Sequence, residues 1–117
     1  MWLLTTSGFF SIVEKPGDRA AGTLTVRARV RGDIESLRTK YLPGLGEIQA
    51  TPDADYAFRA RVAKPELAAA LGRIVLDIHY ANFKSEVAER MGYAREQVYH
   101  EVWETLAELQ QQPARTK

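Results

Sequence analysis

The chain has 117 residues, 45% of them hydrophobic, and its 16 Lys and Arg residues against 15 Asp and Glu residues give a formal net charge of +1. This length suits one domain with one hydrophobic core, and the near-neutral charge argues against a protein that covers nucleic acid with a wide basic surface. The chain contains no cysteine, which excludes a disulfide framework, a zinc ribbon, an iron–sulfur site and a thiol nucleophile and agrees with a cytoplasmic location.

The start of the chain, residues 1–13, is apolar but lacks the pattern of a targeting segment. It has no basic beginning and no Ala-x-Ala cleavage site, so we expect a buried strand there. No stretch of the chain reaches the ~18 apolar residues that a membrane-spanning helix needs. We therefore expect no membrane partner.

The first half of the chain alternates between strand and helix signals. Aromatic and β-branched residues predict one long strand over residues 2–13, with a kink or bulge near Gly8 that leaves open which side chains face the core. Residues 15–22 are rich in turn formers and lead into a second strand over residues 23–31. Asp33 is a suitable N-cap for a short helix over residues 33–41.

The second half repeats this order of elements. A weak strand over residues 46–50 and a turn over 51–55 precede a stronger strand over 56–62. A helix follows, with Pro65 in its first turn, where the missing N–H costs nothing. The apolar stripe expected on this helix consists of Leu67, Ala70, Leu71, Ile74, Val75 and Ile78. The repeated order predicts two ββα units.

The C-terminal third is helical by pattern. Asn82 is a suitable N-cap for a short helix that Gly92 ends, and a final helix is predicted over residues 95–110. One face of the final helix carries Val98, Tyr99, Val102, Trp103, Leu106 and Leu109. This stripe predicts that Trp103 is a core anchor, and residues 111–117 are predicted to form a frayed C-terminal tail.

These elements predict an α+β fold. We expect a four-stranded, mainly antiparallel sheet from the two ββα units, with helices on one face and a helical C-terminal third that closes the core. Residues 1–110 are expected to form a single α+β domain.

Several segments resemble a family of small bacterial proteins of unknown function. They begin with Trp-Leu-Leu-Thr-Thr and Gly-Phe-Phe-Ser-Ile-Val near the start and continue with Leu-Thr-Val-Arg-Ala-Arg-Val and Asp-Tyr-Ala-Phe-Arg. Asp-Ile-His-Tyr-Ala-Asn-Phe-Lys and Tyr-His-Glu-Val-Trp follow in the C-terminal third. The resemblance implies a bacterial, self-contained protein. It implies no activity and assigns no catalytic residue.

Two predicted strands share the motif Arg-Ala-Arg-Val. Because side chains alternate between the two faces of a strand, the arginines fall on one face and the apolar residues on the other. If the two strands are neighbours, these guanidinium groups form an anion-binding cluster for phosphate or carboxylate groups. The predicted anion-binding residues are Arg27, Arg29, Arg59 and Arg61. The alternative is an ordinary solvated sheet face, on which Glu14 and Glu47 neutralise the arginines.

A second group of polar side chains lies where two predicted helices meet. Asp77 or His79 has the chemistry of a general base, and Tyr80 and Lys84 are possible proton donors. The alternative is structural, because a histidine suits the end of a helix and Tyr80 suits packing. Spacing alone assembles no catalytic triad, so no residue is assigned as catalytic.

No metal site and no cofactor are expected. The chain has two histidines, His79 and His100, and neither predicted helix has the i, i+4 histidine spacing of a helical metal motif. The glycines at positions 44 and 46 are not followed by the Lys and Ser or Thr of a phosphate-binding loop.

The leading functional hypothesis is a small non-enzymatic binding module whose arginine-lined sheet face contacts an anionic partner, either a nucleic acid or an acidic protein surface. A single-stranded nucleic acid also needs exposed aromatic side chains among the arginines, for which Trp2 and Phe9 are the candidates. One alternative is an enzyme that acts on a phosphate- or carboxylate-bearing small molecule with the arginines, Tyr56 and the segment 77–84. Another is a structural protein that forms a homodimer through the sheet or through the final helix.

Overall fold

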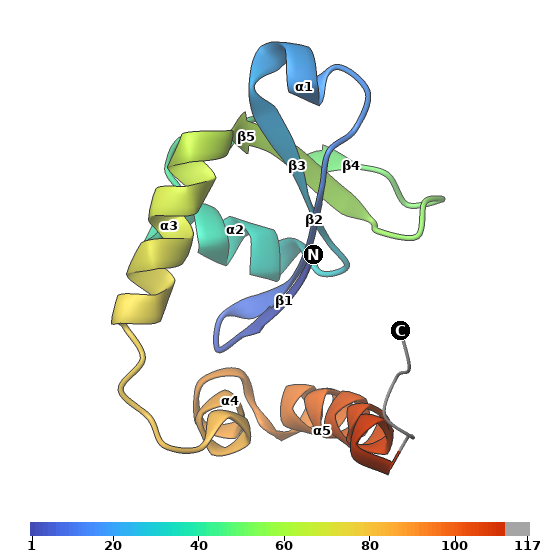
Figure 1. Cartoon of the computed structure of the whole chain (residues 1–117), viewed down its shortest axis with the longest axis vertical. Coiled ribbons are helices and arrows are strands. Elements are labelled where there is room, and N and C mark those ends of the chain that lie inside the picture. Colours follow the sequence, from blue (N-terminus) through green and yellow to red (C-terminus); the bar gives the residue numbers. More distant parts are fainter. Residues whose placement is uncertain (112–117) are drawn as a thin grey trace, which may run out of the picture. The chain divides into compact units, whose positions relative to one another are not determined.

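The computed structural model describes residues 1–111, which fall into two compact units, Met1–His79 and the chain from Tyr80 onward. The first unit contains β1 (Trp2–Thr5), β2 (Gly8–Val13), α1 (Asp18–Ala21), β3 (Thr23–Ala28), α2 (Arg31–Lys40), β4 (Gln49–Ala50), β5 (Phe58–Ala63) and α3 (Lys64–Leu76) (Figure 1). The second contains α4 (Phe83–Met91), α5 (Tyr93–Ala107) and the 3-10 helix η1 (Glu108–Gln111). The α+β class and the helical C-terminal third are therefore confirmed.

The sheet has five strands rather than the predicted four, because the segment 2–13 folds into two strands. β1 pairs antiparallel with β2 through a tight turn, in which the Thr5 hydroxyl accepts hydrogen bonds from the Ser7 and Gly8 N–H groups at 3.1 and 3.0 Å. Gly8 also lies where α2 approaches closely, since a Cβ there would come within 2.7 Å of Asp33 Cβ. The expected kink at this glycine is a full reversal of the chain.

The strand order is β1-β2-β3-β5-β4, and every neighbouring pair is antiparallel. β2, β3 and α2 form one ββα unit, with the short α1 in the connection between the two strands, and β4, β5 and α3 form the second. β1 is the strand that belongs to neither unit. β3 and β5, which carry the repeated arginine motif, are direct neighbours.

α2 and α3 cover one face of the sheet. The core beneath them is formed by Phe10, Ile12, Val26, Ala28, Ile34, Leu37, Leu42, Leu45, Ala60, Val62, Leu67 and Ala70. Val75 and Ile78, the last two residues of the apolar stripe predicted for α3, are 63% and 48% exposed. The stripe that packs on the sheet therefore ends earlier along the helix than predicted. α1 is an addition to the expected loop, and its Asp18 bonds to Thr25, which points to the opposite face of the sheet from Val26.

Two predicted boundaries need correction near α2. The strand ends at Ala28 instead of residue 31, and α2 begins at Arg31 with Val30 as its N-cap. Asp33 lies inside the first turn and is not the N-cap. Its carboxylate instead accepts a hydrogen bond from the Phe9 N–H at 3.0 Å and so ties α2 to β2.

In the second unit the predicted ends of the short helix are confirmed, whereas the final helix, predicted over 95–110, begins at Tyr93 and ends as an α-helix at Ala107. The Asn82 side chain accepts a hydrogen bond from the Ser85 N–H at 2.9 Å, and α4 ends at Gly92, whose φ of +97° suits glycine. Among the described residues of this unit α5 packs on α4, where the buried Tyr99 stacks on Phe83, while Trp103 is 56% exposed. The prediction that Trp103 is a core anchor is therefore wrong for the described unit.

The prediction of one domain over residues 1–110 stays a prediction. The expected tail, 111–117, lies outside the described residues except for Gln111, which ends η1. None of the described helices has the length and apolar character needed to cross a membrane.

Candidate anion-binding face

The face of the sheet opposite α2 and α3 carries arginines from its central strands, and we call it the arginine face. The strand register aligns one residue from each of the five strands across it. Trp2 lies opposite Ser11, Ser11 opposite Arg27, Arg27 opposite Arg59, and Arg59 opposite Gln49. We call these five residues the cross-sheet row. The expected adjacency of the arginine strands is thus present.

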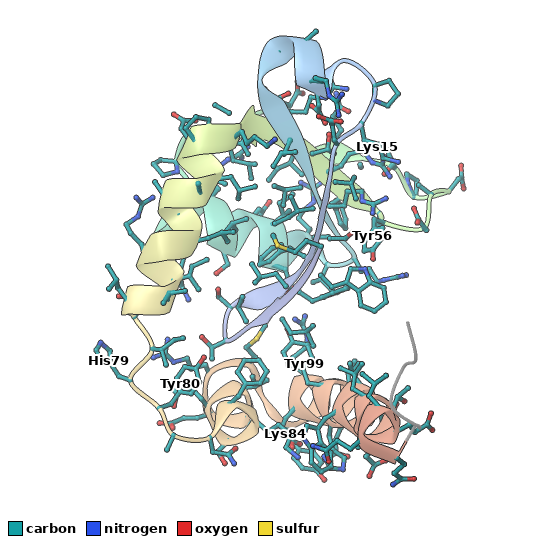
Figure 2. The ribbon with its side chains drawn as sticks, viewed as in Figure 1. Lys15, Tyr56, His79, Tyr80, Lys84 and Tyr99 are labelled. Carbon is teal, nitrogen blue, oxygen red and sulfur yellow. The ribbon has the colours of Figure 1, made fainter. Side chains whose placement is uncertain are left out.

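Two guanidinium groups on this face rest on one tyrosine ring. The Cζ atoms of Arg27 and Arg29 lie 4.5 and 4.6 Å from the centroid of Tyr56, which is only 3% exposed. Figure 2 shows Tyr56 on the side of the strands away from α2 and α3. Arg29 follows β3 rather than lying within it, so this stacking is what keeps Arg29 beside Arg27.

Three of the four predicted arginines have no acidic partner among residues 1–111. Within the part of the chain that the structure describes, Arg27, Arg29 and Arg59 form no ion pair. Arg27 Nη2 donates to the Ser11 hydroxyl at 2.7 Å, and Arg59 Nε donates to the Thr51 hydroxyl at 3.2 Å. These bonds to neutral acceptors hold the side chains in place and leave their positive charge uncompensated.

Glu14 does not neutralise the arginine face, as the alternative interpretation requires. Its carboxylate pairs with Arg19 of α1, with Nη2 and Oε2 3.1 Å apart. Glu47 makes no ion pair with any described residue, although it lies near the arginines at the edge of the sheet.

Arg61 does have an acidic partner, the buried Asp18, which the strand pattern does not predict. Its Nε lies 3.4 Å from Oδ1 of the buried Asp18, which also accepts hydrogen bonds from the Thr23 hydroxyl at 2.5 Å, the Lys15 N–H at 2.7 Å and the Thr25 hydroxyl at 2.8 Å. Burial raises the pKa of Asp18, but these hydrogen bonds and the guanidinium outweigh burial and lower the pKa below its ordinary value. Arg61 is therefore largely neutralised.

A pocket of about 510 Å³ opens on the arginine face near β4. It is lined by Lys15, Thr25, Gly46, Glu47, Gln49, Arg59, Ala60 and Arg61. The Gly46 N–H donates to the Arg61 carbonyl at 2.8 Å, and a Cβ at Gly46 would lie 2.9 Å from that oxygen, so glycine lets the loop close the pocket wall against β5. Lys15 lies on the same side of the strands as Tyr56 (Figure 2).

The aromatic candidates Trp2 and Phe9 both lie on the arginine face. Trp2 is 67% exposed, and its ring meets the ring of Phe9 edge-on, with centroids 5.8 Å apart and planes at 88°. The ring of Phe9 lies 6.3 Å from that of Tyr56. The sequence left the phase of this segment open around Gly8, and the β1–β2 turn settles it.

Asp77 and His79, two of the candidates for proton transfer, lie after α3. Asp77 is the C-cap of α3 and accepts a hydrogen bond from the Tyr41 hydroxyl at 2.8 Å. His79 is exposed and projects from the connecting segment (Figure 2). No hydrogen bond or ion pair joins the two within the described residues.

Tyr80 and Lys84, the other two candidates, belong to the second unit. The ring of Tyr80 lies 6.2 Å from that of Phe83. Lys84 Nζ lies 2.9 Å from His100 Nδ1, and His100 Nε2 lies 2.9 Å from a carboxylate oxygen of Glu104. Lys84 thus makes its contacts with α5 rather than with another of the four candidates. Residues 1–111 contain no group of three or more metal-binding side chains that could hold an ion.

Comparison with known proteins finds no matching family model, no similar curated protein and no similar solved structure. The resemblance to small bacterial proteins stays a prediction.

Proposed function

We propose that this protein is a small, non-enzymatic binding module of the bacterial cytoplasm whose arginine face contacts an anionic partner. The observation that carries the proposal is the set of uncompensated charges on Arg27, Arg29 and Arg59. Guanidinium groups present planar pairs of donors that match phosphate and carboxylate oxygens. These guanidinium groups are already held in place by Tyr56, Ser11 and Thr51, so little side-chain entropy is lost when an anion binds to their remaining donors.

Binding is expected to be local and modest in affinity. The whole chain has a net charge of only +1, so long-range attraction toward a polyanion is weak. The favourable contribution therefore comes from direct contacts with the arginines. Such contacts weaken as the salt concentration rises, since each one releases a counterion from the partner.

Heparin, a polyanion without bases, tests the proposal independently of the identity of the natural partner. The variant is Arg29→Gln with Arg59→Gln, and the matched control is Arg31→Gln with Arg90→Gln. The control removes the same charge from two helix-surface ion pairs, with Glu35 and Glu86. We expect the wild type and the control to bind heparin at low salt and the arginine-face variant to bind about tenfold more weakly or worse. Equal binding by the two variants contradicts the proposal.

The pocket beside β4 supports a second candidate, a site for a phosphate- or carboxylate-bearing small molecule. Lys15 and Arg59 supply positive charge around it, whereas the charge of Arg61 is largely offset by Asp18. Glu47 is the carboxylate able to accept a proton or a hydroxyl hydrogen bond. Inorganic phosphate or citrate should then raise the melting temperature of the protein. No shift with either anion leaves the polyanion as the better ligand.

The exposed apolar side chains of α5 support a third candidate, a homodimer. Val98, Trp103 and Leu106 are each more than half exposed, whereas Tyr99 is buried against α4 and is not available to a partner. Sedimentation of the wild type and of Leu106→Glu tests this candidate. A dimer that the substitution dissociates supports it, and a monomeric wild type at high concentration rules it out.

A further inference from the structure

Trp2 has no packing role that accounts for its position on the arginine face. Its neighbour Leu3 packs on the core, so the alternation of the strand directs Trp2 to the opposite face, where the side chain stays 67% exposed. The T-shaped contact with Phe9 fixes the orientation of the indole and occupies at most one of its faces, and with 67% of the side chain exposed the rest of the ring is accessible to a ligand.

The exposed indole is continuous with the uncompensated charges. The ring of Phe9 neighbours the rings of both Trp2 and Tyr56, and Tyr56 in turn contacts the guanidinium groups of Arg27 and Arg29. A flat, apolar surface and a cationic surface therefore adjoin on the same side of the sheet. A ligand that uses both must combine flat rings with negative charges.

The spacing of the cross-sheet row suits a chain molecule. Trp2 and Arg27 are two strand intervals apart, or ~10 Å, and Trp2 and Arg59 are three intervals apart, or ~14 Å. A short single-stranded nucleic acid that lies across the sheet can therefore place one base on Trp2 and the phosphates that follow it on Arg27 and Arg59. Sheet faces that carry aromatic side chains are established platforms for unpaired bases.

We infer that the anionic partner of the arginine face is a single-stranded nucleic acid, one base of which stacks on Trp2. This inference rests on the proposed function. A duplex keeps its bases stacked on one another and offers no ring to Trp2, and it needs a wider basic surface than a chain of net charge +1 provides. An acidic protein surface matches the arginines but does not account for the oriented, exposed indole.

The test compares a labelled oligothymidylate of about ten nucleotides, a duplex of the same length and heparin. The variant is Trp2→Leu, and the matched control is Trp103→Leu, which removes the exposed tryptophan of the second unit. We expect Trp2→Leu to weaken binding of the oligothymidylate by about tenfold and to leave heparin binding unchanged, because stacking contributes only where bases are present. Trp103→Leu should change neither.

A second measurement does not depend on the fold of the Trp2 variant. In Trp103→Phe the remaining tryptophan is Trp2, and the oligothymidylate should quench its fluorescence while heparin should not. Heparin binding without a preference for the single strand, or without quenching, overturns this inference and leaves the proposed function intact, with an acidic protein as partner. Binding to none of the three probes at low salt overturns both.

Discussion

Replacing Asp18 by Asn should destabilise the protein strongly, because this carboxylate organises one end of the arginine face. It is fully buried and accepts hydrogen bonds from Thr23, Thr25 and the Lys15 N–H, with Arg61 at ion-pair distance. Hydrogen bonds to a charged group contribute ~1.5–3 kcal/mol each. Asn keeps one acceptor oxygen and turns an NH₂ group toward the other donors. We therefore expect a loss of about 2–4 kcal/mol in the free energy of unfolding.

The effect of Asp18→Asn should depend on pH in a defined direction. The pKa of Asp18 is lower in the folded protein than its ordinary value of 3.8, so the folded state favours the charged form. The stabilisation is thus fully present above the ordinary pKa and disappears as the pH falls through the folded-state pKa. The difference between the wild type and Asp18→Asn should be constant near neutral pH and shrink in acid.

Urea unfolding followed by circular dichroism measures this difference. With a slope of ~2 kcal/mol per M for a domain of this size, the midpoint should fall by roughly 1–2 M at neutral pH. Asp53→Asn is the matched control, since Asp53 is exposed and makes no hydrogen bond or ion pair among the described residues. If the two variants unfold at the same urea concentration, Asp18 does not have the role assigned to it.

Two further predictions concern packing. Gly8→Ala should cost about 1–3 kcal/mol, because the new Cβ would come within 2.7 Å of Asp33, whereas Gly32→Ala, with nothing within 4 Å of the added atom, should change the stability by less than about 1 kcal/mol. If the two variants shift the urea midpoint equally, the close approach of α2 to β2 at Gly8 does not contribute to the stability of the protein. Tyr99→Ala should destabilise by about 3 kcal/mol, and Trp103→Ala by about 1 kcal/mol or less, since only Tyr99 is buried. Calorimetry that finds the larger loss for Trp103→Ala would mean that this side chain is covered in solution.

The alternation of side chains was sufficient to predict the arginine face. Arg27 and Arg59 fall opposite each other because both strands repeat the same apolar and polar period, and any register other than an in-phase one would bury a guanidinium group. The same period fails at residues 2–13, because the turn at Thr6 and Ser7 interrupts it, and this turn determines the face on which Trp2 lies.

The acidic partner of Arg61 could not be predicted from the same pattern. Asp18 comes from a segment with the composition of a loop, and its burial depends on Thr23 and Thr25, whose hydroxyls meet its carboxylate only after β3 has formed. The available signal in the sequence was an aspartate shortly before two threonines at i and i+2, whose side chains share one face of β3. The burial of Trp103 was predicted wrongly because an apolar stripe on a helix does not show how many of its residues a neighbouring helix covers.

The salt dependence of oligothymidylate binding tests the central claim most directly, because it counts the arginines in contact with phosphate. With three uncompensated arginines, the slope of log affinity against log salt concentration should be about −2, at ~0.7 per contact. Arg59→Gln should reduce the size of this slope by about 0.7. Arg61 lies on the same strand and face as Arg59, but Asp18 already neutralises it, so Arg61→Gln should reduce the slope by clearly less. A wild-type slope near zero, or the same slope in Arg59→Gln as in the wild type, would contradict the assignment of the arginine face as the binding surface.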